Sequence, residues 1–148
     1  PKPIDLIRTW EESGYSIGFT NGCFDIIHPG HISLLHCAKN ECDKLVVGLN
    51  SDSSVAKLKG KDRPIQKENA RATVLLALKD VDVVIIFNEE TPIKLIELIK
   101  PDVLIKGGDY KIDEIVGAEF IQQNGGRVVL SDYKKGHSTS DIIKKIES

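Results

Sequence analysis

Short apolar runs that alternate with helical patterns constrain the fold of this chain more than any other feature. Residues 44–50 are almost continuously apolar, as strands covered by helices on both faces are. The expected strands are residues 16–20, 44–50, 83–87, 102–106 and 127–131. The expected helices are residues 4–13, 29–40, 68–79, 93–99, 114–123 and 142–146. This alternation predicts an α/β fold: a Rossmann-like, doubly wound, mainly parallel five-stranded sheet with helices on both faces.

The length and composition fit one soluble domain. A chain of 148 residues is long enough to bury a core, and we expect a single domain over residues 1–148 with a helical lead-in over residues 1–14. A formal charge of −2 argues against general nucleic-acid binding, so nucleic acid is not an expected partner. The apolar runs are too short to cross a bilayer and the first residues lack a signal-peptide pattern, so we expect no membrane association and a cytoplasmic location. Three cysteines without a Cys-x-x-Cys pair suggest neither a disulfide framework nor a zinc site.

The turn between the first strand and the next helix carries the strongest chemical signal. Residues 21–31 read Asn-Gly-Cys-Phe-Asp-Ile-Ile-His-Pro-Gly-His, with His28 and His31 three residues apart around Pro29 and Gly30. Free backbone N–H groups and the helix dipole favour an anion at such a position, so we expect a phosphate site into which two imidazoles point. The alternative is a pair of ordinary surface histidines. His36 lies inside the helix and is expected only to pack or to face solvent.

Three further polar segments follow strands. Residues 51–66 lack periodicity and contain a basic cluster around Gly60, which predicts a mobile loop or lid. Residues 106–110 form a second glycine turn, and the cap of the terminal helix lies within residues 131–140. Ligand sites of doubly wound sheets lie off the carboxyl ends of the strands, so all four segments are expected to meet at one edge. The His28-Pro29-Gly30-His31 sequence within it suits nucleotidyl transfer, which needs positioning and charge neutralisation more than a covalent catalyst.

The motifs resemble those of a known superfamily. Residues 22–31 resemble the Gly-x-Phe-Asp-x-x-His-x-Gly-His signature of the cytidylyltransferase-like nucleotidyltransferases, and Ser138-Thr139-Ser140 is similar to their second motif. Residues 19–25, 58–65 and 106–110 look most like the heptose 1-phosphate adenylyltransferases. The resemblance extends from Tyr15 to Ile146.

The resemblance implies transfer of AMP from ATP to D-glycero-β-D-manno-heptose 1-phosphate, with Mg²⁺, giving ADP-heptose and pyrophosphate. The implied partners are small molecules, a nucleoside triphosphate and a sugar phosphate, and related enzymes are commonly homo-oligomers. Some relatives carry this domain fused to a sugar kinase, so the chain is expected to be a separate single-domain form or a piece of such a fusion.

The resemblance also implies roles for individual residues. The implied catalytic residues are His28, His31, Lys59 and Arg71. The implied nucleotide-binding residues are Thr20, Asn21, Gly22, Cys23, Phe24, Asp25, Lys57, Arg63, Lys106, Gly107, Asp109, Ser138, Thr139 and Ser140. No residue is expected to be a dedicated metal ligand, although Asp25 could help to place the metal, hold the turn or be a buried structural carboxylate. The alternatives are a solvated basic loop for the lysines, a surface position for Arg71 and a plain strand-ending turn for Asp109.

Two competing functions remain open at this point. One is a glycerol-3-phosphate or other phospho-alcohol cytidylyltransferase that uses CTP, and the other is a nucleotide-binding module without turnover. Residues 133–137 (Tyr-Lys-Lys-Gly-His) lack the arginine that cytidylyltransferases often carry before the second motif, which weakens the first alternative. The presence of both His28 and His31 weakens the second, because a pure binder would not require the pair.

Overall fold

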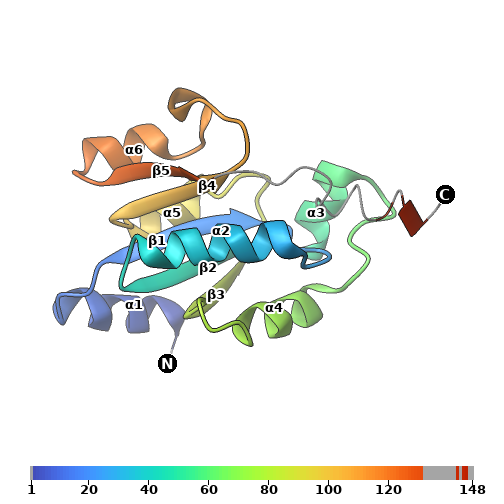
Figure 1. Cartoon of the computed structure of the whole chain (residues 1–148), viewed down its shortest axis with the longest axis horizontal. Coiled ribbons are helices and arrows are strands. Elements are labelled where there is room, and N and C mark those ends of the chain that lie inside the picture. Colours follow the sequence, from blue (N-terminus) through green and yellow to red (C-terminus); the bar gives the residue numbers. More distant parts are fainter. Residues whose placement is uncertain (1, 132–142, 144, 147–148) are drawn as a thin grey trace.

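Every strand of the central sheet runs parallel to its neighbours. The computed structural model describes residues 2–131, 143, 145 and 146, and its strands lie in the order β3-β2-β1-β4-β5 (Figure 1). The strands are β1 (Ile17–Gly22), β2 (Lys44–Asn50), β3 (Val83–Phe87), β4 (Val103–Gly107) and β5 (Arg127–Ser131). All five expected strands are present, which confirms the α/β, doubly wound prediction.

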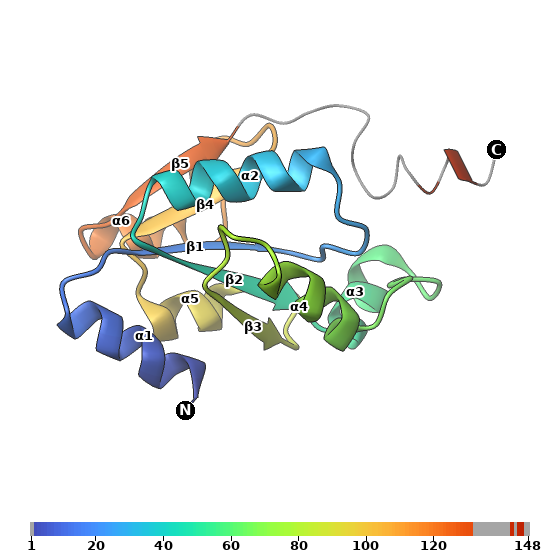
Figure 2. The same ribbon diagram turned by 60° about the horizontal axis from the view of Figure 1, so that its bottom comes forward.

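Helices cover both faces of this sheet (Figure 2). They are α1 (Pro3–Glu12), α2 (Pro29–Asn40), α3 (Asp52–Lys59), α4 (Glu68–Leu76), α5 (Ile93–Ile99) and α6 (Ala118–Gln123), with a 3-10 turn, η1, at Ile112–Glu114. Side chains of α1, α5 and α6 form one apolar core with the sheet, and those of α2 and α4 form the other. The helix expected at residues 142–146 falls largely outside the described residues.

Alternation along the strands divides the apolar side chains between these two cores. Val46 belongs to the core beneath α1 and α5, whereas the next residue, Val47, belongs to the core beneath α2 and α4. Successive side chains of a strand point to opposite faces, so a strand covered on both sides must be apolar at consecutive positions. Both valines are fully buried.

The prediction of a mobile loop over residues 51–66 is wrong for the first half of that segment. Residues 52–59 form α3, whose N-cap Ser51 accepts a hydrogen bond from the Ser54 amide. Ser54 is also held from two other segments: it accepts a hydrogen bond from the Asn50 side chain and donates one to the Glu89 carbonyl. The helix has few apolar residues, so its anchors are polar and leave no hydrophobic periodicity in the sequence.

Smaller differences occur at three helix ends. The helix expected at residues 114–123 is split into η1 and α6, because Gly117 between them adopts a φ of +89° and its backbone lies against Ile96, where a Cβ would come within 2.7 Å. Helix α4 ends at Leu76 instead of residue 79, and α5 begins after Pro92 without the expected side-chain cap from Thr91.

The chain changes direction between β1 and β4. The first three strands progress towards one edge of the sheet, and β4 then returns to the opposite side of β1. The crevice at the carboxyl ends of the strands at such a switch point is where doubly wound folds bind ligands. In the part of the chain that the structure describes, no helix is both long and apolar enough to cross a bilayer.

Candidate active site

A cavity of about 600 Å³ opens at this switch point. It brings together the turn after β1, the end of α3 with the loop that follows it, and the end of β4. The expected site residues that line it are Asn21, Gly22, Cys23, Phe24, His28, His31, Lys59, Arg63, Lys106 and Gly107. Three of the four segments expected to converge therefore do so. The fourth reaches the described residues only at Ser131, and Ser138, Thr139 and Ser140 lie outside them.

The turn after β1 is held in a backbone conformation that few side chains adopt. Phe24 has a φ of 45°, and its buried ring lies 5.0 Å from the His31 ring, centroid to centroid. A Cβ at Gly22 would come within 3.0 Å of the Phe24 ring, so the glycine makes room for it. Strain of this kind persists where the surrounding contacts hold it in place, and here it directs the chain from β1 towards the two histidines.

The two histidines cap α2 with their own side chains. His28 is the N-cap residue, and its Nδ1 accepts a hydrogen bond of 3.1 Å from the Gly30 amide. His31 Nδ1 accepts one of 3.3 Å from the His28 amide, which completes a reciprocal capping box. The imidazole rings stack with centroids 3.8 Å apart. A ring nitrogen that accepts a hydrogen bond carries no proton, so each neutral imidazole has its proton on Nε2.

The capping box corrects the expectation of free helix-terminal amides. Pro29 has no N–H, the Gly30 amide bonds to His28 Nδ1, and the His31 amide bonds to the His28 carbonyl. The described first turn of α2 therefore keeps its dipole but has used its amides within the helix. An anion at this end would be met mainly by side-chain donors.

Burial keeps His31 neutral. Loss of solvent, and to a smaller degree the charge of His28 and Lys59, lowers the pKa of His31 to about 4, against the opposing effect of a hydrogen bond with the Ile26 backbone. At pH 7 the imidazole is therefore an uncharged hydrogen-bond donor.

We expect this depressed pKa to make the free protein less stable in mild acid. Unfolded His31 takes up its proton near pH 6.5, whereas folded His31 does so only near pH 4. The stability that comes from keeping His31 neutral is therefore complete above pH 6.5 and is lost as the pH falls towards 4. At pH 5 the free energy of unfolding should drop by about 2 kcal/mol on this account. Urea unfolding at pH 7.5 and pH 5 measures the drop.

His31→Gln should remove most of this pH dependence, whereas His36→Gln, at an exposed position on the same helix, should keep it. Equal pH dependence in wild type and His31→Gln would contradict the prediction.

Asp25 has a structural role in this arrangement. Its buried carboxylate accepts hydrogen bonds from the Ile65 amide at 2.8 Å and the Gln66 amide at 2.9 Å, and from Arg63 Nε at 3.0 Å. Burial alone would raise the pKa of Asp25, but the amides and Arg63 together hold it below its usual range. Asp25 does not line the cavity, and its charge ties the turn after β1 to the loop before α4.

Arg71 also lies outside the cavity. It is 1% exposed, which excludes the surface position that helical arginines usually take. Its Nη1 donates to the carbonyls of Cys23 and Asn50, both at 2.7 Å, and its Nη2 donates to Asp52 Oδ1 at 2.9 Å. Nε donates to a fourth segment, at the Gln66 carbonyl. Arg71 thus holds the ends of β1 and β2 and the start of α3 together, and within the described residues it acts on the site through Cys23 and Asn50, which line the cavity.

Not all of the lysines expected in the site line the cavity. Lys59 and Lys106 line the cavity, whereas Lys57 is an exposed residue of α3 that does not. Burial lowers the pKa of Lys106, and its Nζ lies 5.2 Å from the centre of the Tyr110 ring. Burial also raises the pKa of the Cys23 thiol, with Lys59 opposing this, so Cys23 is not arranged as a thiolate nucleophile.

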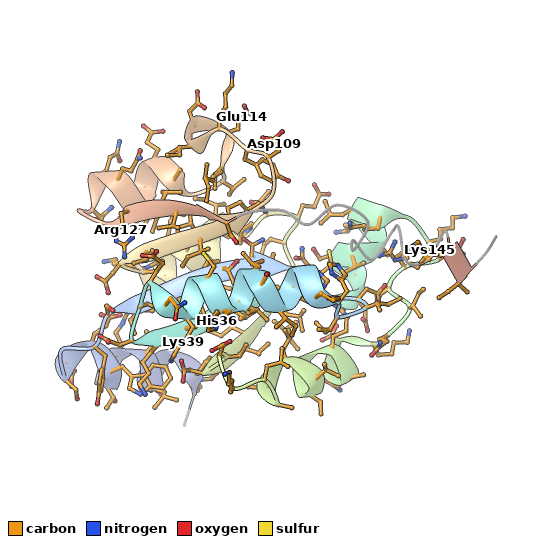
Figure 3. The ribbon with its side chains drawn as sticks, in the orientation of Figure 1. His36, Lys39, Asp109, Glu114, Arg127 and Lys145 are labelled. Carbon is orange, nitrogen blue, oxygen red and sulfur yellow. The ribbon has the colours of Figure 1, made fainter. Side chains whose placement is uncertain are left out.

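Thr20 and Asp109 do not line the cavity. Thr20 is fully buried in β1, and Asp109 is an exposed residue of the loop that leaves β4, on which Glu114 also lies (Figure 3). Sequence reasoning did not name as site residues several that do line it: Asn50, Glu90, Thr91, Tyr110 and Glu114. Asn50 ends β2 and the others lie beyond the ends of β3 and β4, and Tyr110 also belongs to the glycine turn at residues 106–110.

No described set of three or more His, Cys, Asp or Glu side chains is arranged to hold a metal ion. The three donors on its carboxylate leave Asp25 poorly suited to metal binding.

Comparison with known proteins agrees with this geometry. A family model described as Cytidylyltransferase-like matches residues 19–145. The protein named "Bifunctional protein HldE" in Paramagnetospirillum magneticum is 56% identical over 142 residues, or 96% of this chain, and its counterpart in Mesorhizobium japonicum is 54% identical over 143 residues, or 97%. The chain spans 29% of the length of each of these two relatives.

Solved structures also share the fold of this chain. The lipopolysaccharide core biosynthesis protein from Thermoplasma volcanium is 36% identical, with a TM-score of 0.66 over 82% of this chain and 98% of that one. Pantoate-β-alanine ligase from Francisella tularensis, at 20% identity and a TM-score of 0.64 over 98% of this chain and 72% of that one, shares the fold. The histidine pair, the cavity at the switch point and these matches together show that the chain belongs to the cytidylyltransferase-like family of nucleotidyltransferases.

Proposed function

We propose that this domain transfers AMP from ATP to D-glycero-β-D-manno-heptose 1-phosphate, releasing pyrophosphate and forming ADP-heptose. The observation that carries the proposal is the stacked pair of His28 and His31, which shares one cavity with Lys59 and Arg63 at the switch point of the sheet. The choice of a heptose acceptor is supported by the resemblance at residues 19–25, 58–65 and 106–110, and by the name of the Thermoplasma protein, which assigns that protein to lipopolysaccharide core biosynthesis.

In the proposed reaction an oxygen of the acceptor phosphate attacks the α-phosphorus of ATP. The new O–P bond forms as the bond between the α-phosphorus and its bridging oxygen to the β-phosphorus breaks, and the electron pair leaves with pyrophosphate. Charge on the phosphate oxygens is what the protein has to stabilise. The Nε2–H groups of His28 and His31 and the ammonium of Lys59 are suited to this, and Mg²⁺ would enter as the complex of ATP.

The protein needs no covalent intermediate for this transfer. Cys23 lines the cavity, but burial favours its protonated thiol, so its contribution is expected to come from its backbone. Arg71 fixes the Cys23 carbonyl and thereby the turn. The other requirement of the transfer is that the two substrates are held in position, which rigid elements around a cavity of this kind can supply.

Pyrophosphate release tests this assignment. We expect release only when ATP, Mg²⁺ and heptose 1-phosphate are all present, because the attacking oxygen belongs to the acceptor. The panel should combine ATP, CTP and GTP with heptose 1-phosphate, glycerol 3-phosphate and phosphocholine.

Two outcomes of the panel would contradict the proposal. Turnover only with CTP would assign the chain to a cytidylyltransferase, and the absence of turnover with every pair would favour a nucleotide-binding module. His31→Ala run on the same panel controls for a contaminating enzyme, because background activity would not respond to the substitution.

A further inference from the structure

Arg63 is a mostly buried cation, and only part of its hydrogen-bonding capacity is used within the described residues. Its side chain is 13% exposed, and Nε donates to Asp25 Oδ2 at 3.0 Å. Nη2 is buried and has no hydrogen-bond partner among the described residues. Leaving a buried, charged donor without an acceptor is costly, so its persistence here points to an anion that completes the site. Arg63 is one of the residues that line the cavity, so an anion bound there would approach the guanidinium from the cavity side.

Asp25 holds Arg63 in this position. The same carboxylate binds the amides of Ile65 and Gln66, so the loop that carries Arg63 is fixed on both the side-chain and the backbone side. The Arg63 amide also donates to the Gly60 carbonyl. Little conformational freedom remains to be lost when an anion binds, which favours affinity. The planar fork of arginine matches the oxygens of a phosphate group.

The position of Arg63 in the fold indicates which phosphate it meets. The His28–His31 pair follows β1, in the middle of the sheet, and Lys106 lies on β4 to one side of it. Arg63 belongs to the crossover between β2 and β3, on the other side of β1, and these two sides lead to opposite edges of the sheet (Figure 1). If the nucleoside lies towards β4, as the glycine turn after that strand suggests, the partner that approaches from the β2 side is the acceptor.

We propose that Arg63 binds the phosphate group of the acceptor, with Asp25 as the residue that positions it. This inference rests on the proposed transfer to a sugar phosphate and replaces the expectation that Arg63 contacts the nucleotide. The assignment places the attacking phosphate beside the β2–β3 crossover and the nucleoside beside β4, with the histidine pair between them.

Steady-state kinetics with each substrate varied in turn test the assignment. Arg63→Ala should raise the KM for the acceptor about 10- to 100-fold, the scale of losing charge-assisted hydrogen bonds, while the KM for ATP changes less than about threefold. Lys106→Ala, on the β4 side, should instead raise the KM for ATP and change the KM for the acceptor less. Lys61→Ala removes a charge from the same loop at an exposed residue that does not line the cavity, and it should change neither constant.

A double-mutant cycle separates positioning from a purely structural effect of Asp25. Asp25→Asn should raise the acceptor KM in the wild-type background but have little further effect in Arg63→Ala, because the two residues act as one unit. If Asp25→Asn fails to fold, Arg63→Lys replaces it: it keeps the charge, loses the fork and should raise the acceptor KM less than Arg63→Ala does.

The outcomes distinguish this inference from the proposed function. An unchanged acceptor KM in Arg63→Ala, or a KM for ATP that rises as much, overturns the inference even if wild type makes ADP-heptose. If wild type instead uses another phosphate acceptor or CTP, the proposed function fails, and the same comparison is made with that pair. A wild type that turns over no pair overturns both.

Discussion

Replacing His31 by alanine should lower kcat by about 10²-fold or more, the scale of losing one preorganised donor to a developing charge. His31 is neutral at pH 7, and its Nδ1 accepts a hydrogen bond from the His28 amide, so its only N–H is on Nε2. His28→Ala should have an effect of similar size, because its ring is fixed in the same way by the Gly30 amide. Rates of pyrophosphate release at saturating ATP and acceptor measure both.

His36→Ala is the matched control for these two variants. It lies on the same helix (Figure 3). Its side chain is 59% exposed, and its ring contacts Asp80 and does not line the cavity, so kcat should be unchanged. Losing the cap interactions is expected to lower the free energy of unfolding of the active-site variants by about 1 kcal/mol, which urea unfolding can verify. Near wild-type rates in either His28→Ala or His31→Ala would remove that histidine from the mechanism.

Arg71→Met should reduce the free energy of unfolding by about 3–5 kcal/mol, the cost of breaking a buried charge site that makes four hydrogen bonds. The substitution leaves three carbonyls, those of Cys23, Asn50 and Gln66, without their donor and Asp52 without its ion pair. For a domain of this size the melting temperature should fall by roughly 10 °C. Urea and thermal unfolding measure the two quantities.

Arg127→Met provides the contrast. Arg127 is 55% exposed in an ion pair with Glu41, so its loss should cost less than about 1 kcal/mol. Equal effects at the two positions would show that the buried network around Arg71 contributes no more than a surface pair. Assays of Arg71→Met well below its melting temperature then test the role of Arg71 in catalysis. A displaced Cys23 carbonyl should lower kcat even while the protein is folded.

The strands and most helices follow from local pattern. Residues 44–50, 83–87 and 127–131 match β2, β3 and β5 at both ends, because short apolar runs rich in Val, Ile and Leu and bounded by polar residues favour strands over helices. Helix α3 was missed because its cap, its Ser54 anchors and its Asp52–Arg71 ion pair are polar and partly distant in sequence. The glycine turn after β4 was predictable as a turn, but not that Tyr110 would line the cavity while Asp109 would not.

The parallel α/β sheet, its helical layers and the histidine turn can be predicted from the amino-acid order, since they depend on periodicity and on residues within a few positions of each other. The roles of the charged residues, in contrast, depend on contacts that form only in the folded chain. Asp25 meets Arg63 across 38 positions and Cys23 meets Arg71 across 48, and contacts of that separation leave no local pattern. The same holds for the burial that makes His31 a neutral donor, because the pKa depends on how much solvent the folded chain removes.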